Sequence, residues 1–321
     1  MRIIITFFIA FTFFSCEKKE LPAPAYDRGD AVTAQVNMTS NYKNQVWFSL
    51  SGNTVVSTNF KTDWDIAFEA SAAGNHVILN SALGMRAYKT NHTQLSNVTD
   101  TAGMAAKETV DSPTGNLDST AVGDWQLNNT VYIINRGYSE TGAVLGFYKL
   151  KILSASASSV TFEYADVFGS QTYQGTINKD NQYNFQAYSF SSHQQLLIEP
   201  AKTSYDLCFT QFTHVFHNPF QFYQVTGVLS NSYNTRVANV TDKAFSNITA
   251  NDTVGRSFSN FKNAIGYDWK VFDLNTNLYT VNSSHCYIIN DSKGFYYKLH
   301  FIDFYNSNGI KGYPTFEFKK L

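Results

Sequence analysis

The sequence predicts an all-β protein made of two tandem, related antiparallel β-sheet domains that follow a lipoprotein signal peptide. Aromatic residues make up 16% of the chain, with Phe and Tyr dominant, and this composition favours strands. Several short segments alternate bulky with small or polar residues, which is the period of a strand. One line of sequence also occurs twice, as KTDWDIAFEAS at Lys61–Ser71 and KTSYDLCFTQF at Lys202–Phe212.

The first element is an export signal. Arg2 precedes a short apolar run, Ile3–Phe14. The run is shorter than the roughly 20 apolar residues that a membrane-spanning helix needs. We therefore predict a secretory signal peptide over residues 1–15.

The next element is a lipid anchor with its tether. Ser15 followed by Cys16 resembles a bacterial lipobox, although Phe13 stands where that motif usually has Leu. We predict that Cys16 is lipidated and becomes the mature N-terminus, and that residues 16–38 form a charged, Pro-containing tether. An ordinary signal peptide with an incidental cysteine is the alternative.

The two copies of the β unit then follow. Further matches occur in the same order in both halves, and their offsets drift only by the lengths of loops. We therefore predict a tandem duplication, with repeat 1 over residues 39–178 and repeat 2 over residues 179–321. The matches are NVTD at Asn97–Asp100 and Asn239–Asp242, YIIN at Tyr132–Asn135 and Tyr287–Asn290, FYKLKI from Phe147 and YYKLHF from Tyr296, and TFEY at Thr161–Tyr164 and TFEF at Thr315–Phe318.

We expect each copy to contain a strand at the repeated line, then a hairpin and a closing strand. Trp64, Ile66 and Phe68 alternate with smaller residues, so that a strand would place them on one face. Residues 130–153 and 283–305 each form a strand, a Gly-containing turn and a return strand, and NDSKG in the second copy has hairpin turn chemistry. SSVTFEYADV and YPTFEFKKL are the predicted closing strands.

The overall charge and the cysteines limit the functional classes. A net charge of −1, with 15% charged residues, gives no basic footprint for nucleic acid. Past Cys16, only Cys208 and Cys286 remain, and each lies in an apolar, strand-like run. We expect two buried free thiols, and a disulfide between them is the alternative.

The order of these motifs resembles the HmuY-type haem-binding lipoproteins of Gram-negative envelopes. The resemblance covers about residues 42–170 and 183–321. It rests on TDWDIAF, on GDW and GYDW midway through the copies, on the YIIN hairpins and on the terminal GYPTFEF. It implies an outer-membrane lipoprotein, periplasmic or surface-exposed, that binds haem or a related porphyrin for uptake or storage. Its partners would be an outer-membrane haem receptor or a host haemoprotein, and the membrane through the lipid anchor.

Candidate haem ligands are histidines that recur with the repeat. For this chain we expect His or Met as the axial ligand of haem iron. His76 lies twelve residues after Trp64, and His217 lies twelve residues after Tyr205. His217 and His76 are therefore the first-choice ligands and His214 the next, whereas Met85 is expected in the core. Histidines that only form hydrogen bonds on half-exposed loops are the alternative.

The sequence offers no sign of other site chemistry. His214 and His217 form an H-x-x-H pair, which a helix would place on one face but a strand on opposite faces. Without a third ligand nearby, we predict no metal site beyond haem iron. The motifs of a nucleophile elbow, a P-loop, a dinucleotide site and a zinc protease are missing, so we predict a non-enzymatic protein. The alternative function is a cell-surface protein- or glycan-interaction or structural lipoprotein that does not bind haem.

Overall fold

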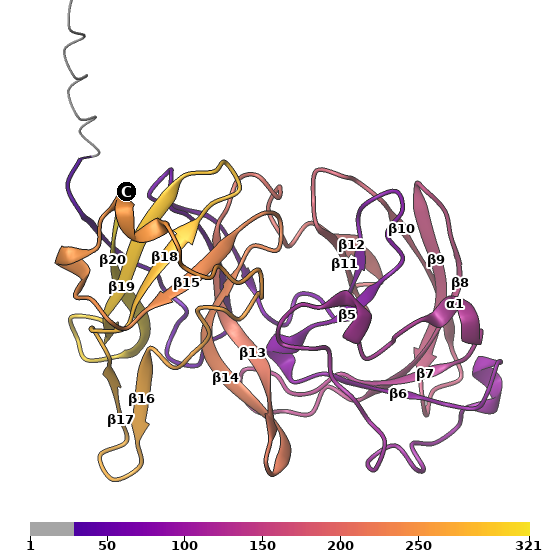
Figure 1. The fold of residues 1–321 in the computed structure, drawn as a ribbon. Helices are drawn as coiled ribbons and strands as arrows, with labels where there is room; N and C mark the ends of the chain where they lie inside the picture. The colour runs from indigo at the N-terminus through magenta and orange to yellow at the C-terminus, as the bar shows by residue number, and fades with distance from the viewer. Residues whose placement is uncertain (1–28) are drawn as a thin grey trace, which may run out of the picture.

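A computed structural model describes residues 29–321, and these fold almost entirely into antiparallel strands (Figure 1). The predicted all-β class is confirmed. The predicted signal peptide, Cys16 and the first part of the tether lie outside the described residues. No helix in the described part is long and apolar enough to cross a membrane. The helical segments are short: η1 (Ser81–Leu83), η2 (Leu95–Asn97), η3 (Leu117–Ser119), α1 (Trp125–Asn128), η4 (Phe245–Asn247) and η5 (Ala250–Thr253).

Two sheets form what we call the first unit, which contains strands β4 to β12. Its five-stranded sheet has the order β10 (Thr172–Asn178), β9 (Ser159–Asp166), β8 (Phe147–Ala155), β7 (Tyr132–Asn135) and β6 (Arg86–Lys89). Its four-stranded sheet has the order β12 (Gln194–Leu196), β11 (Phe185–Ser189), β4 (Ile66–Glu69) and β5 (Val77–Leu79).

The second unit contains strands β1 to β3 and β13 to β20. Its five-stranded sheet has the order β1 (Val32–Gln35), β20 (Lys311–Lys320), β19 (Tyr296–Tyr305), β18 (Cys286–Asn290) and β15 (Arg236–Val240). Its four-stranded sheet has the order β14 (Phe220–Ser230), β13 (Leu207–His217), β2 (Asn44–Ser49) and β3 (Thr54–Phe60). A separate hairpin joins β16 (Lys270–Asp273) to β17 (Leu278–Val281).

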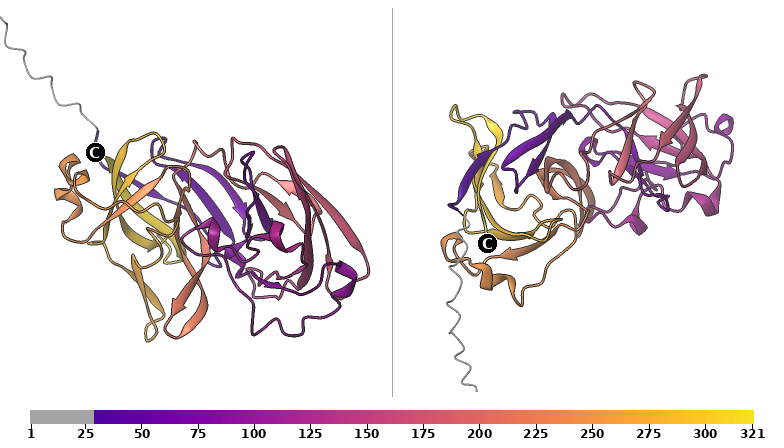
Figure 2. Two further views of the ribbon diagram at one scale, coloured as in Figure 1. Left: turned by 45° about the vertical axis from the view of Figure 1, so that its right-hand side comes forward. Right: turned by 90° about the horizontal axis from the view of Figure 1, so that it is seen from above.

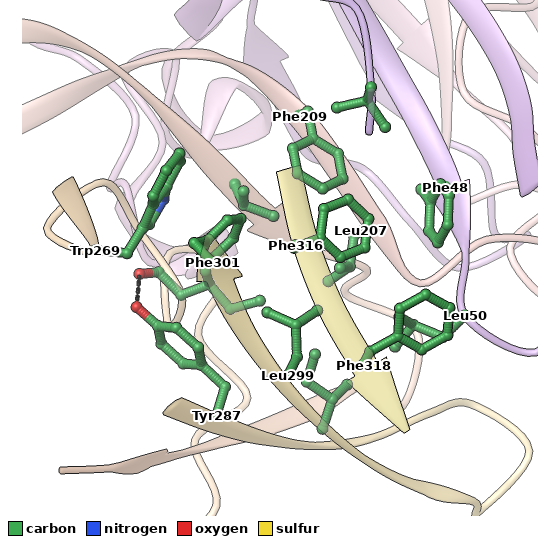
Figure 3. Packing of buried hydrophobic residues seen from close by; sticks show 14 of the residues in the cluster. Phe48, Leu50, Leu207, Phe209, Trp269, Tyr287, Leu299, Phe301, Phe316 and Phe318 are labelled. Carbon is green, nitrogen blue, oxygen red and sulfur yellow. Dashed lines mark hydrogen bonds between the residues drawn. The ribbon is translucent and has the colours of Figure 1, made fainter. Parts of the chain in front are cut away.

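Each unit has its own hydrophobic core between its two sheets, and the two units lie side by side (Figure 2). In the second unit, Phe48 and Phe209 from one sheet meet Phe316 from the other (Figure 3). Trp269 stacks on Phe301 with ring centroids 3.9 Å apart, which closes one end of this core. Burial of so many aromatic rings makes the core the main source of stability in this unit.

The two sequence halves exchange a hairpin. β2, from the first half, pairs with β13 of the second half, and Phe48 lies opposite Leu207. β11, from the second half, pairs in the same way with β4 of the first half, and Tyr188 lies opposite Ile66. Strand pairing thus crosses the boundary predicted between residues 178 and 179, and the division into two tandem domains stays a prediction.

The repeated line fixes the start of a strand in the first unit. The backbone N–H of Phe190, which follows β11, donates to Asp65 Oδ2 over 2.7 Å. Asn80 Nδ2 donates to the carbonyl oxygens of Lys61 and Trp64, over 2.7 and 2.8 Å. The motif therefore holds the hairpin that comes from the other half of the sequence.

The same contacts recur in the second unit. The backbone N–H of Leu50, which follows β2, donates to Asp206 Oδ2 over 2.7 Å. Asn231 Nδ2 donates to the carbonyl oxygens of Lys202 and Tyr205, over 2.8 and 2.9 Å. A duplication predicts such matched contacts, although the sequence matches did not include the two asparagines.

One of the predicted sequence matches does not hold in the structure. Asn97 ends the 3₁₀ turn η2, whereas Asn239 lies within strand β15. The turn that corresponds to η2 is η4, because a buried lysine satisfies each turn's backbone. Lys149 Nζ donates to the carbonyl of Val98 over 2.8 Å, and Lys298 Nζ donates to that of Ile248 over 2.9 Å.

Candidate functional site

The long hairpin β13–β14 carries His214 near its end. His214 is half-buried, and its ring packs on Phe216 and Tyr267 with centroid distances of 4.8 and 5.1 Å. Its Nδ1 is buried and has no hydrogen-bond partner among the described residues. Burial, followed by the neighbouring charge of His217, lowers the pKa of His214. The imidazole is therefore neutral at neutral pH, the form in which histidine binds a metal.

His217 ends strand β13 and is exposed to solvent. It lies opposite Phe220 across the hairpin, with ring centroids 6.3 Å apart, whereas His214 lies opposite Tyr223. Because successive side chains of a strand alternate, His214 and His217 belong to opposite faces. The prediction that a strand would separate the H-x-x-H pair is confirmed.

His76 lies just before strand β5 and is hydrogen-bonded to a carboxyl group. Its Nδ1 is 2.7 Å from Glu69 Oε2, and its side chain is 39% exposed. It lines a surface cavity of about 280 Å³ together with Trp125 and Asp118. The contact with Glu69 leaves Nε2 as the ring nitrogen that can face this cavity.

The structure does not place His76 and His217 equivalently. In the first unit Phe68 pairs with Val77, so His76 lies after the turn of its hairpin. In the second unit Phe209 pairs with Val228, so the hairpin is longer and His217 lies before its turn. The equal spacing of twelve residues therefore places the two histidines at different positions in their hairpins, His76 after the turn and His217 before it. Within residues 29–321, no hydrogen bond or ring contact joins His76 to His214 or His217.

The three described methionines belong to the hydrophobic cores. Met38, Met85 and Met104 are each no more than 3% exposed. The expectation that Met85 is a core residue is confirmed. No group of three or more His, Cys, Asp or Glu residues within the described range is arranged to hold a metal ion.

Three other histidines have hydrogen-bond partners. His193 Nδ1 is 2.7 Å from the hydroxyl of Tyr164, His285 Nε2 is 3.0 Å from Asn239 Oδ1, and His300 Nε2 is 2.9 Å from Glu317 Oε2. These contacts give each ring a structural role.

Both cysteines in the described range are buried and free, as expected. Burial raises the pKa of each thiol, and this makes both thiols poor nucleophiles.

Several solved structures match this chain, each with low sequence identity and a low TM-score. Apo PinO from Porphyromonas gingivitis has 8% identity and a TM-score of 0.31, with 91% of this chain and 98% of that chain covered. The apo HmuY analog (TFO) from Tannerella forsythia has 9% identity and a TM-score of 0.26, with 92% and 98% covered. No curated protein matches the sequence.

The family itself follows from the sequence match. The HmuY protein family matches residues 41–318, which is most of the chain. The chain therefore belongs to the HmuY family, and the resemblance inferred from its motifs is confirmed.

Proposed function

We propose that this protein is an envelope lipoprotein that binds haem or a related porphyrin, for uptake or storage, without enzymatic turnover. The observation that carries the proposal is membership of the HmuY family over residues 41–318. The protein would be anchored through Cys16 to the outer membrane. It would exchange its ligand with an outer-membrane haem receptor or take it from a host haemoprotein.

The residues that line the end of the β13–β14 hairpin fit a porphyrin. His214 presents a neutral imidazole whose buried Nδ1 lacks a partner, and a histidine must be neutral to bind haem iron. Tyr267 lies beside His214, and Tyr223 lies opposite it across the hairpin. Flat aromatic rings of this kind pack well against a planar macrocycle.

His76 offers a second place for one axial ligand. A carboxylate bound to one ring nitrogen orients a histidine and raises its basicity at the other nitrogen, as is common for histidines that ligate metals. The neighbouring cavity of about 280 Å³ has Trp125 and Leu117 in its wall together with polar residues such as Asp118 and Gln126. His76 and the hairpin histidines lie apart, so each place would supply a single protein ligand.

His217 is the most accessible of the three candidates. It lies at the end of a hairpin that projects from the same end of the molecule as β16–β17 (Figure 1 and Figure 2, left). Both hairpins expose apolar side chains, including Phe220 at 67% and Leu274 at 82%. Exposed apolar surface of this kind also favours the second candidate function, a surface-interaction lipoprotein, because such patches often bind partners.

A haemin titration of the soluble form that begins at Glu17 tests the proposal. Bound haem would supply an iron whose Soret absorbance reports its axial ligand. We expect saturable binding with a shifted Soret band. One of three variants, His214→Ala, His76→Ala or His217→Ala, should weaken binding and change the spectrum.

His92→Ala is the matched control, since His92 is an exposed histidine outside these places. Saturable binding that survives all three substitutions would retain the haem carrier and reject these ligands. A haemin titration without any saturable spectral change would favour the surface-interaction function.

A further inference from the structure

Two adjoining cavities lie where the first unit meets the second. Their volumes are about 260 and 80 Å³, and both are lined by residues from β4, β5 and β11 of the first unit and from β13 and β14 of the second. No His or Met belongs to the described walls of either cavity, so a haem there would have no axial ligand of these types. The residues common to both cavities are Ile78, Leu79, Ser81, Phe185, Leu229 and Lys262.

Both cavities share the apolar Ile78, Leu79, Phe185 and Leu229. The larger one adds Leu117 and Phe212 beside polar residues such as Ser112 and Asn116, and the smaller one has mainly apolar and aromatic walls. Ala67, Ala187 and Ile198 form a buried cluster with Trp47 and Trp64 packed against it. The polar wall atoms are engaged with one another: the Trp64 indole N–H donates to Gln45 Oε1 over 2.9 Å, and Gln45 Nε2 donates to Thr210 Oγ1 over 2.9 Å. The walls therefore favour a ligand with a planar, apolar ring.

Three carboxyl groups line the cavities; Glu69 is engaged by His76, and the other two also have donors. Asp111 accepts hydrogen bonds from the backbone N–H groups of Leu79 and Ala121, over 2.7 and 2.8 Å. Glu199 accepts hydrogen bonds from Asn184 and from the hydroxyl of Tyr205. Neither carboxylate forms an ion pair within the described part of the chain.

Lys262 is different, because its ammonium group has no hydrogen-bond acceptor among the described residues. It lies 5.8 Å from the ring centroid of Phe185, which lines both cavities. Its charge acts on Asp111, Glu199 and Cys208 around it. The stem of the side chain passes over Gly115, where an added Cβ would lie 2.5 Å from Lys262 Cδ. The ammonium is thus a partly buried donor from which the carboxylate of a ligand can accept a hydrogen bond.

We propose that the cavity between the two units binds a small aromatic monocarboxylate, with the ring between the apolar walls and the carboxylate on Lys262 Nζ. A cavity on the order of 150 Å³ accommodates benzene in another protein. The larger cavity here, at about 260 Å³, can therefore take a fused two-ring acid. None of the three candidate histidines lines this site, although its wall includes Glu69, the hydrogen-bond partner of His76.

Calorimetric titration with naphthalene-2-carboxylate, at pH 7.5 and on the soluble form, tests the proposal. We expect binding that Lys262→Met weakens by roughly 10- to 100-fold, the effect of losing one hydrogen bond to a charged group. Lys262→Arg should retain binding because it keeps the charge. Lys293→Met is the matched control, since Lys293 Nζ lies outside the cavity and contacts Ser51.

The neutral analogue naphthalene-2-carboxamide separates the charge from the apolar fit. It should bind the wild-type protein more weakly than the acid does, and equally to Lys262→Met. Equal affinities of acid and amide for the wild-type protein would overturn the proposal, whether or not the variants fold. Absence of acid binding would also overturn it, and Lys262 would then only balance the charges of Asp111 and Glu199.

Saturation of the protein with haemin should leave the acid's affinity unchanged. Loss of acid binding in the presence of haemin would show one common site and so overturn the proposal of a separate one. Because the acid titration needs no haemin, failure of the haem proposal would not affect it.

Discussion

Replacement of Asp65 by Asn should destabilise the protein far more than the matched replacement of Asp206. The Asp65 side chain is 2% exposed, and that of its partner Arg136 is 10% exposed. Arg136 Nε and Nη2 donate to the two carboxylate oxygens of Asp65 over 2.7 and 3.2 Å. Asn has nearly the same shape and can still accept from Phe190, but it leaves the guanidinium of Arg136 buried without its counter-charge.

The two magnitudes follow from this difference. Removal of one partner from a buried ion pair costs about 3–5 kcal/mol, because the remaining charge is uncompensated. Asp206 has no ion-pair partner within residues 29–321, and its hydrogen bond from the Leu50 backbone can persist with an amide oxygen. Asp206→Asn should therefore cost about 1 kcal/mol or less.

Urea denaturation of the soluble form at pH 7.5 measures both free energies of unfolding. The double variant Asp65→Asn with Arg136→Met should recover part of the loss, because it removes the unpaired charge as well. Equal losses for Asp65→Asn and Asp206→Asn would refute the reasoning, as would a double variant less stable than the sum of the two single changes.

Three further predictions concern protonation and thiols. Burial raises the pKa of Asp206 from 3.8 to about 6, so the native state binds this proton more tightly than the unfolded state does. Protonated Asp206 therefore stabilises the fold, and this stabilisation is lost as pH rises from about 4 to 6. The urea midpoint should fall less across this pH range for Asp206→Asn than for the wild-type protein. If His214 ligates haem, its lowered pKa should keep the haemin affinity constant down to pH values below 6.5, the ordinary pKa of histidine. Haemin titrations at decreasing pH measure this affinity. An affinity that already declines above pH 6.5 would argue against His214. Cys208 and Cys286 are buried, so the folded soluble form should react slowly with an aromatic disulfide reagent and the urea-unfolded form should release two equivalents at once; rapid reaction of the native protein would contradict the burial.

The all-β class and the family could be predicted from sequence because they depend on local pattern. Alternation in KTDWDIAF and in its copy predicts strands wherever one side of the strand is buried. Ile66 and Phe68 do enter the core of the first unit. The hairpin motifs are contiguous in the chain, and turn chemistry specifies them without knowledge of distant contacts.

Burial on both sides of β4 could not be predicted in this way. Ala67 and Asp65 belong to the opposite side of the strand from Ile66, yet they are 3% and 1% exposed. The reason is that Ala67 belongs to a buried cluster against which Trp47, from β2 of the second unit, is packed. A period of two shows that the faces differ but not what lies against each of them.

For the candidate sites too, sequence predicted what depends on local pattern and missed what depends on distant contacts. Sequence alone selected His76, His214 and His217 by residue type and spacing, and it correctly separated the H-x-x-H pair by strand geometry. Spacing failed for His76 and His217, because strand length depends on the partner strand and only the second hairpin extends to residues 217 and 220.

Sequence reasoning did not find the equivalent roles of Asn80 and Asn231, the exchange of hairpins between the two halves or the cavity at Lys262. The exchanged hairpins and the cavity depend on strands that meet across more than a hundred residues, and no local pattern encodes which distant strand they join. Composition and period thus determined the kind of structure, and long-range strand pairing determined where its sites lie.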